Sequence, residues 1–146
     1  YGREQYPTAT SLLLLCDGGG SNSARSYLFK AALQDLATDL NLDMRVAHYP
    51  PYTSKYNPIE HRLFPHLTRA TQGVIFDTVE TVKDLMATAT TATGLSVFTT
   101  VLDKVYETGK KATDELKASI QVVFDDILPQ WNYTALANPS QIGSII

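Results

Sequence analysis

Residues 11–22, SLLLLCDGGGSN, join an apolar run to an acidic residue and a glycine-rich turn. A continuous apolar run of this length is typical of a strand buried on both faces, in the middle of a sheet with parallel neighbours. Asp17 stands at the carboxyl end of the expected strand, where open α/β sheets gather their functional groups. This stretch therefore predicts a parallel sheet with Asp17 at its functional edge.

The residues that follow complete a β-α-β unit. Ser21 or Asn22 is expected to cap a helix, because apolar residues recur at helical spacing from about Ser23 to Leu40. Residues 44–49, MRVAHY, alternate between apolar and polar side chains as a half-exposed strand does. The fold class expected from this pattern is α/β.

Composition limits the classes of protein that fit. With 146 residues, 44% hydrophobic and 18% charged, the chain has the profile of a globular protein rather than a disordered one. No apolar run approaches the roughly 20 residues that cross a bilayer, so we expect no membrane partner. The single cysteine, Cys16, excludes an internal disulfide and fits a cytoplasmic location. At the end of an apolar run, Cys16 is expected to be a small buried hydrophobe rather than a nucleophile.

Positive charge is concentrated in one segment although the net charge is −3. Residues 45–69 hold four basic residues against one acid, and they also hold all three histidines. The rest of the chain holds eight basic and fourteen acidic residues. Because the local field attracts a polyanion, this segment is a candidate DNA contact, although a solvated loop has the same composition.

A helix is expected within residues 46–64, VAHYPPYTSKYNPIEHRLF. Asn57 can cap it, and proline is favoured in a first turn, where Pro58 stands. The helix should end near Pro65 or a few residues beyond it. Its apolar residues Ile59, Leu63 and Phe64 are expected to point inward.

Further along the chain, three elements are expected and one segment has no clear assignment. Residues 77–94 predict a helix with Asp77 as cap and Glu80 completing a capping box. Residues 95–103 predict a strand, residues 113–120 predict a short capped helix, and residues 121–136 fit no single element.

Two carboxylates stand at comparable places in this pattern. Asp17 ends the first strand, and Glu60 lies in the first turn of the helix after the second strand. Carboxylates that converge from separate elements can share a hard divalent cation. Paired cations of this kind stabilise the attacking and leaving oxygens in phosphoryl transfer. The simpler alternative is an Asx-turn at Asp17 and a favourable helix-dipole contact at Glu60.

The order of these motifs resembles that of a known family. CDGGGSN at 16–22, the PPYTSKYNPIEHRLF segment that contains Glu60, and WNYT at 131–134 resemble the Rhodopirellula-type transposase DDE domain, which is related to mariner-type transposases. The resemblance implies an RNase H-like fold and cleavage and strand transfer of DNA with Mg²⁺ or Mn²⁺. It implies that Asp17 and Glu60 are catalytic metal ligands.

The chain departs from the family pattern upstream of Asp17. The family places its first catalytic Asp on an earlier strand, whereas Glu4 is the only acid before Asp17. We therefore expect an incomplete RNase H-like fold that lacks its first strands, a C-terminal fragment that is inactive alone, and weak or absent metal binding. Residues 1–93 are expected to form the core, and residues 94–146 a small α/β appendage packed on it.

The neighbours of the two carboxylates have candidate roles in binding DNA. Basic side chains would contact the backbone, and a tyrosine would stack on a base or pack its loop. The histidines would touch a phosphate or a metal, or make structural hydrogen bonds. The residues concerned are Lys55, Arg62, Arg69, His48, His61 and Tyr52.

The glycine-rich loop leaves another function open. Gly18, Gly19, Gly20 and Asn22 permit a tight turn or a close backbone approach to a ligand. A non-catalytic α/β module that binds a phosphate ligand or a protein partner through this loop is therefore the alternative. A homo-oligomer also remains open.

Overall fold

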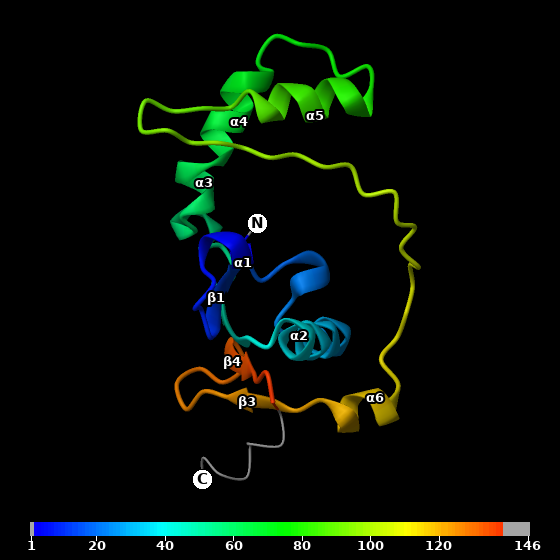
Figure 1. The fold of residues 1–146 in the computed structure, drawn as a ribbon. Coiled ribbons are helices and arrows are strands. Elements are labelled where there is room, and N and C mark those ends of the chain that lie inside the picture. Colours follow the sequence, from blue (N-terminus) through cyan, green and yellow to red (C-terminus); the bar gives the residue numbers. More distant parts are fainter. Residues whose placement is uncertain (1, 139–146) are drawn as a thin grey trace. The chain divides into compact units, whose positions relative to one another are not determined.

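A computed structural model describes residues 2–138 (Figure 1). The chain divides into two compact units. The first, which we call the sheet unit, comprises Tyr1–Ser54 and Gly109–Ile146; the second, the helical unit, comprises Lys55–Thr108. The boundary expected at residue 94 stays a prediction.

The sheet unit contains a mixed four-stranded sheet in the order β1-β2-β4-β3. β1 and β2 run parallel, with Cys16 opposite His48, whereas β4 is antiparallel to both β2 and β3. The parallel pair confirms the expected β-α-β unit. The strands are β1 (Ser11–Cys16), β2 (Asp43–His48), β3 (Val122–Phe124) and β4 (Asn132–Ala135).

Helix α2 (Tyr27–Leu40) connects the parallel strands. It begins later than the sequence pattern predicts, because Ser26 rather than Ser21 or Asn22 is its N-cap and accepts a 3.1 Å hydrogen bond from the Phe29 amide. A short 3-10 turn, η1 (Gly20–Asn22), precedes it. The helix ends at Asn41, whose φ of 49° lies in the left-handed region that asparagine tolerates.

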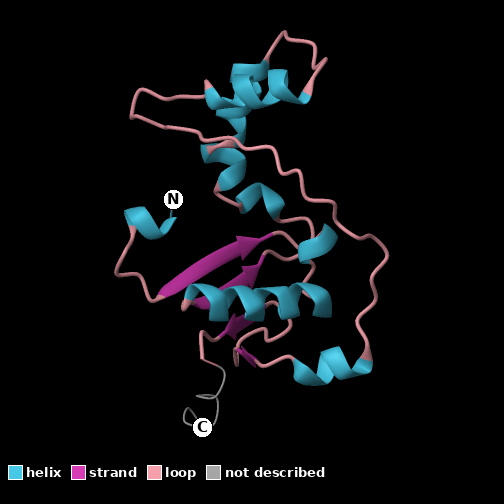
Figure 2. Cartoon of the chain, turned by 45° about the vertical axis from the view of Figure 1, so that its right-hand side comes forward, coloured by secondary structure: helices cyan, strands magenta, loops and turns pink. Residues whose placement is uncertain are grey.

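The core lies between α2 and one face of the sheet (Figure 2). Alternate residues of the central strands point into it, as the period of two requires. The buried members are Leu33, Ala37, Leu42, Met44, Val46, Tyr133 and Ala135. Met44 and Val46 are fully buried while Arg45 is exposed, which confirms the half-exposed character expected of β2.

Strand β1 is an edge strand, so the expectation that it is buried on both faces is wrong. Among the described residues it has only β2 beside it, and α2 packs on one face of the sheet. Leu13 and Leu15, on the other face, are 55% and 42% exposed. Leu14, on the helix side, packs against the core.

Two short helices complete the sheet unit. In α1 (Gly2–Gln5), Arg3 donates hydrogen bonds to the carbonyl oxygens of Ala9 and Leu40, at 2.7 and 2.6 Å. Helix α6 (Asp114–Ser119) is capped by Thr113, which confirms the short helix expected there.

The helical unit contains α3 (Ile59–Arg62), α4 (Phe64–Thr71) and α5 (Val79–Ala87). The expected single helix breaks at Leu63, where φ is −123°, and a new helix starts with Pro65 in its first turn. Contrary to expectation, Ile59 and Phe64 are not buried, at 39% and 40% exposed.

Helix α5 is shorter than predicted. Its N-cap is Thr78, which accepts a 3.0 Å hydrogen bond from the Thr81 amide. Asp77, the expected cap, instead accepts a hydrogen bond from the Thr81 hydroxyl at 2.8 Å.

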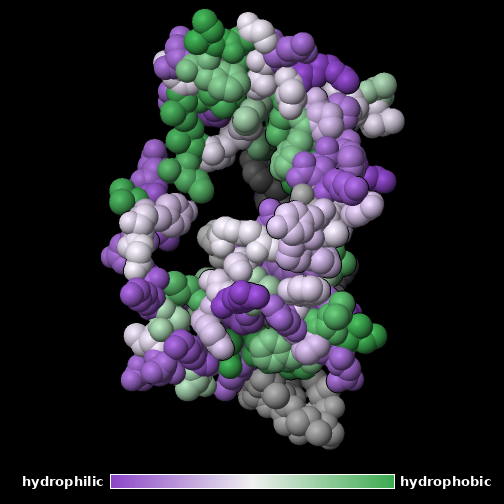
Figure 3. Space-filling model, turned by 180° about the vertical axis from the view of Figure 1, so that it is seen from behind, coloured by the Kyte–Doolittle hydropathy of each residue, from purple (hydrophilic) through white to green (hydrophobic). Residues whose placement is uncertain are grey.

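Residues 95–113 form no helix or strand (Figure 1). The strand expected at residues 95–103 is therefore wrong, because a strand needs a neighbour with which to exchange backbone hydrogen bonds and none within residues 2–138 pairs with this segment. Apolar side chains such as Val105 remain on the surface, and hydrophobic patches are visible in Figure 3.

No helix in the described part of the chain is long and apolar enough to span a membrane.

Candidate active site

Asp17 follows β1 directly, and its side chain is exposed. Its backbone is held from the neighbouring strand: the His48 ring nitrogen Nδ1 lies 3.3 Å from the Asp17 carbonyl oxygen. One residue earlier, the Cys16 carbonyl accepts a 2.7 Å hydrogen bond from the Tyr49 amide. The end of β1 is thus fixed by β2, while the carboxylate is free to bind a ligand.

His48 is buried, at 6% exposed, with both ring nitrogens occupied. Its Nε2 lies 3.0 Å from the Tyr133 hydroxyl, and its ring meets Phe29 edge-on. This is the placement of the structural hydrogen bond rather than of the phosphate contact also expected for His48. Tyr133 of β4 and Phe29 of α2 both lie against the buried ring, with centroids 5.6 and 6.2 Å from it.

The protonation of His48 follows from this environment. Burial lowers the pKa of the His48 ring, and the nearby Lys30 charge lowers it further, while the Asp17 carbonyl and charge oppose the shift. A neutral ring with its proton on Nδ1 satisfies both contacts: the Tyr133 hydroxyl donates to Nε2, and Nδ1–H donates to the Asp17 carbonyl. Tyr133, His48 and Asp17 therefore form one chain of hydrogen bonds from β4 to β1.

Lys30 is a buried cation beside this chain, at 5% exposed. It donates a hydrogen bond to the Ala24 carbonyl, and its ammonium lies 4.8 Å from the centroid of the Tyr133 ring. Burial lowers the pKa of Lys30. Burial also raises the pKa of the Tyr133 phenol, so that its hydroxyl remains a hydrogen-bond donor.

The glycine-rich loop does not lead directly into a helix. Gly18 and Gly19 have ordinary φ angles, Gly20 has a φ of 63°, and α2 starts only at Tyr27. The helix N-terminus that the phosphate-binding alternative requires is therefore not formed by these glycines. The Asn22 side chain makes a hydrogen bond with Cys16. Burial raises the pKa of the Cys16 thiol, and this hydrogen bond partly offsets the shift.

Glu60 lies in the helical unit, in the first turn of α3, and is exposed. The turn before it is held locally: the Asn57 carbonyl accepts a 3.1 Å hydrogen bond from the Glu60 amide, and the Asn57 side chain accepts one from the Ile59 amide at 3.4 Å. The prediction of Asn57 as the cap is wrong, because Pro58 is the N-cap of α3 and has no side-chain cap hydrogen bond. The carboxylate of Glu60 is thereby presented to solvent at the start of a helix.

A cavity of about 460 Å³ lies within the helical unit, next to Glu60 in sequence. His61, Arg62 and His66 line it together with Thr91 and Thr93. His61 Nε2 is 2.6 Å from the Lys55 carbonyl, and His66 Nδ1 is buried with no hydrogen-bond partner in the described part of the chain. No motif marks His66 in the sequence, where the one signal is its position about one turn beyond His61 and Arg62.

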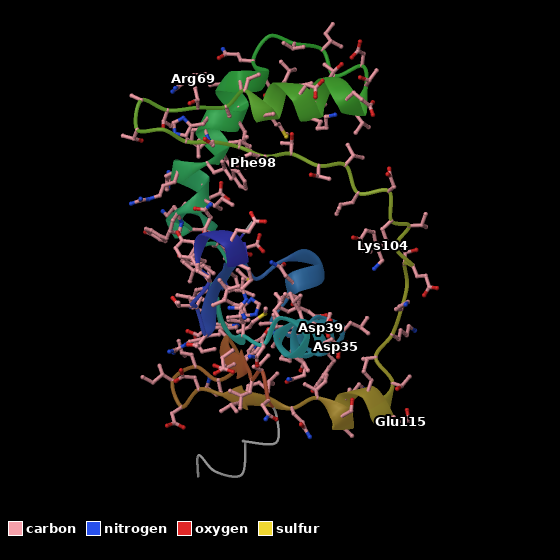
Figure 4. The ribbon with its side chains drawn as sticks, in the orientation of Figure 1. Asp35, Asp39, Arg69, Phe98, Lys104 and Glu115 are labelled. Carbon is pink, nitrogen blue, oxygen red and sulfur yellow. The ribbon has the colours of Figure 1, made fainter. Side chains whose placement is uncertain are left out.

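The remaining candidate DNA contacts are exposed. The Lys55 ammonium lies 5.1 Å from the centroid of the Tyr56 ring. Arg69 projects from the last turn of α4 (Figure 4). Tyr52, in the sheet unit, is 99% exposed and has a φ of 65°, a left-handed conformation that is uncommon for a residue with a bulky side chain.

These features can be compared with known proteins. A family model described as Rhodopirellula transposase DDE domain matches residues 1–137. The chain belongs to that family. No curated protein and no solved structure gives a match.

In this transposase DDE domain, the chemistry of the two carboxylates suits a hard divalent cation. Within the described residues, no three acidic, histidine or cysteine side chains form a group that could hold a metal ion. Asp17 belongs to the sheet unit and Glu60 to the helical unit. Carboxylate oxygens are the ligands that Mg²⁺ uses, usually one or two of them together with water and substrate phosphate.

Proposed function

We propose that this chain carries part of the catalytic site of a DNA transposase, with Asp17 and Glu60 as ligands of Mg²⁺ or Mn²⁺. The observation that carries the proposal is the family match, combined with the positions of these two exposed carboxylates. Asp17 stands at the carboxyl end of a parallel strand, and Glu60 opens the helix that follows the next strand. An RNase H-like core has this arrangement, and we propose that fold.

The reaction would be an in-line displacement at a phosphodiester. The oxygen of water, or of a 3′-hydroxyl, forms a bond to phosphorus while the bond from phosphorus to the leaving 3′-oxygen breaks; the proton leaves the attacking oxygen and the departing oxygen gains one. A bound cation would supply stabilisation of the charge on these oxygens. The role of Asp17 and Glu60 is to hold it, and that of the Tyr133–His48 pair is to keep the Asp17 backbone in place.

DNA contacts are proposed in both units. Arg62, His61 and His66 line one cavity, which offers a cation and imidazole groups to a phosphate. Lys55 and Arg69 add exposed positive charge, and Tyr52 offers an exposed ring. Such contacts would position a strand without reading its sequence.

A third carboxylate is proposed to come from a strand beside β1. The family pattern places its first Asp on an earlier strand. Among the described residues, only β2 pairs with β1, which carries exposed apolar side chains on both faces, including Leu12 and Leu13. Without that ligand, we expect Mn²⁺ to bind this chain weakly and the chain alone to be inactive.

The test is a titration of this chain with Mn²⁺, followed by the relaxation of water protons. Asp17→Asn and Glu60→Gln are each expected to weaken binding, whereas Asp39→Asn, on the exposed face of α2 (Figure 4), is the matched control. Equal losses in all three variants would indicate unspecific attraction and would refute the site. In the full-length transposase, the first two changes are expected to abolish strand cleavage.

A further inference from the structure

A second cavity lies at the same edge of the sheet as Asp17, and all of its lining belongs to the sheet unit. Its volume is about 280 Å³, close to the lower end of the roughly 300–1,000 Å³ of pockets for small ligands. Gly18, Arg25, Tyr49, Gln130 and Trp131 line it, among others. These side chains come from three segments that lie far apart in the sequence.

The three segments are tied together through their backbones. The His48 amide donates a 2.9 Å hydrogen bond to the Trp131 carbonyl, and the Tyr49 amide donates one of 2.7 Å to the Cys16 carbonyl. Gly18 comes so close to the second segment that a Cβ atom there would lie 3.4 Å from the Tyr49 carbonyl oxygen. The cavity is therefore framed by the strand ends and is not a gap between mobile loops.

The lining combines two aromatic rings with a cation and an amide. Tyr49 and Trp131 are half-buried, whereas Arg25 is exposed, and its guanidinium is free to meet an anion at the rim. Aromatic rings stack on a nucleobase whatever its identity, and a neighbouring arginine binds the phosphate. Gln130 adds hydrogen-bonding groups that a base edge can use.

We infer that this cavity holds one unpaired nucleotide of the DNA strand whose neighbouring phosphodiester is brought to Asp17. The base would stack on Trp131 or Tyr49, and its phosphate would meet Arg25. The inference rests on the proposed function, since it gives the DNA strand a binding pocket beside the proposed metal ligand. It assigns binding roles to Arg25 and Trp131, which lie outside the basic segment 45–69, and to Tyr49 within that segment.

The chain carries its own reporter, because Trp131 is its only tryptophan. Titration of the intact chain with a short oligodeoxythymidine is expected to quench Trp131 fluorescence in a saturable manner. An abasic oligomer of the same length is expected to leave the fluorescence unchanged. Arg25→Ala should weaken binding about tenfold and reduce the salt slope of the affinity by about 0.7, the value for one phosphate contact on a single strand.

The matched control is Lys111→Ala, which removes one exposed positive charge from the sheet unit but does not line the cavity. It should leave both affinity and salt slope unchanged. The inference would be overturned by an absence of quenching, by equal effects of the two variants, or by equal quenching with the abasic oligomer or with pyrophosphate. Equal quenching with pyrophosphate would assign the cavity to free phosphate.

Asp17→Asn separates this inference from the proposed function. Quenching of Trp131 should persist in that variant, because Asp17 is not part of the lining. If Asp17→Asn leaves Mn²⁺ binding intact while the oligonucleotide still quenches Trp131, the metal site fails and the nucleotide pocket stands. If Mn²⁺ binding is lost in Asp17→Asn but the native chain shows no quenching, the pocket fails and the metal site stands.

Discussion

Removing the hydroxyl group of Tyr133 tests the support that β4 gives to Asp17. Tyr133 is 1% exposed, and its hydroxyl lies 3.0 Å from His48 Nε2. The Tyr133→Phe variant keeps the ring and its contact with Lys30, so it deletes one hydrogen bond and leaves a buried nitrogen acceptor without a partner. An unsatisfied buried group costs about 1–3 kcal/mol, and we expect the free energy of unfolding to fall by that amount.

The assay is urea denaturation at pH 7 followed by Trp131 fluorescence, which reports on the sheet unit that contains both residues. Tyr6→Phe is the control, because that side chain is 70% exposed, and its change should stay within about 0.5 kcal/mol. If Tyr133→Phe is no more destabilising than Tyr6→Phe, the hydrogen bond to His48 does not support the strand ends as argued.

Three further predictions concern the same unit. Burial holds the pKa of Tyr133 above its usual value near 10, so the folded state retains the phenol proton longer than the unfolded chain does. The stability advantage of the native chain over Tyr133→Phe is therefore complete below pH 10 and should shrink as the pH rises further; a constant gap in urea melts up to pH 11 would contradict this. Ser26→Ala removes the cap of α2 and should cost about 1 kcal/mol in the same melts, whereas an unchanged midpoint would show that the cap is dispensable. Leu13→Lys, on the exposed face of β1, should change the free energy of unfolding by less than about 0.5 kcal/mol. It should reduce self-association measured by light scattering, because lysine on an edge strand opposes edge-to-edge pairing. Unchanged self-association would show that copies of the chain do not associate through β1.

Local patterns predicted the β-α-β unit well. The alternation in residues 44–49 gave a half-buried strand because its period of two is encoded within the segment itself. The helix before it was also predicted, but its first residue was not: the segment SNSARS, residues 21–26, offers several capping residues, and Ser26 is the one that caps the helix.

Features that depend on distant partners could not be predicted. The apolar run of β1 suits a strand buried on both faces, but burial depends on neighbours, and here β1 has one strand beside it and a helix on one face. Residues 95–103 contain strand-forming residues without a strand to pair with. In contrast, β3 and β4 form from residues that gave no clear pattern, because Tyr133 and Ala135 pair with β2 across a long sequence separation.

The same contrast between local patterns and contacts of distant residues holds for the candidate site. Motif order singles out Asp17 and Glu60, and their catalytic role stays a prediction, whereas the burial of His48 and its contact with Tyr133 needed the fold. The cavity beside Asp17 joins Arg25 to Trp131, and no local pattern connects residues so far apart.

The most direct test of the central claim is a crystal structure of this chain soaked in Mn²⁺, in which the separation of the Asp17 and Glu60 carboxylates is measured. Oxygen ligands lie about 2 to 2.6 Å from a shared cation, so two of them can be at most about 5 Å apart. We predict carboxylate oxygens within that distance, with any anomalous peak lying between them. Carboxylates on opposite sides of the fold would contradict the proposed catalytic site.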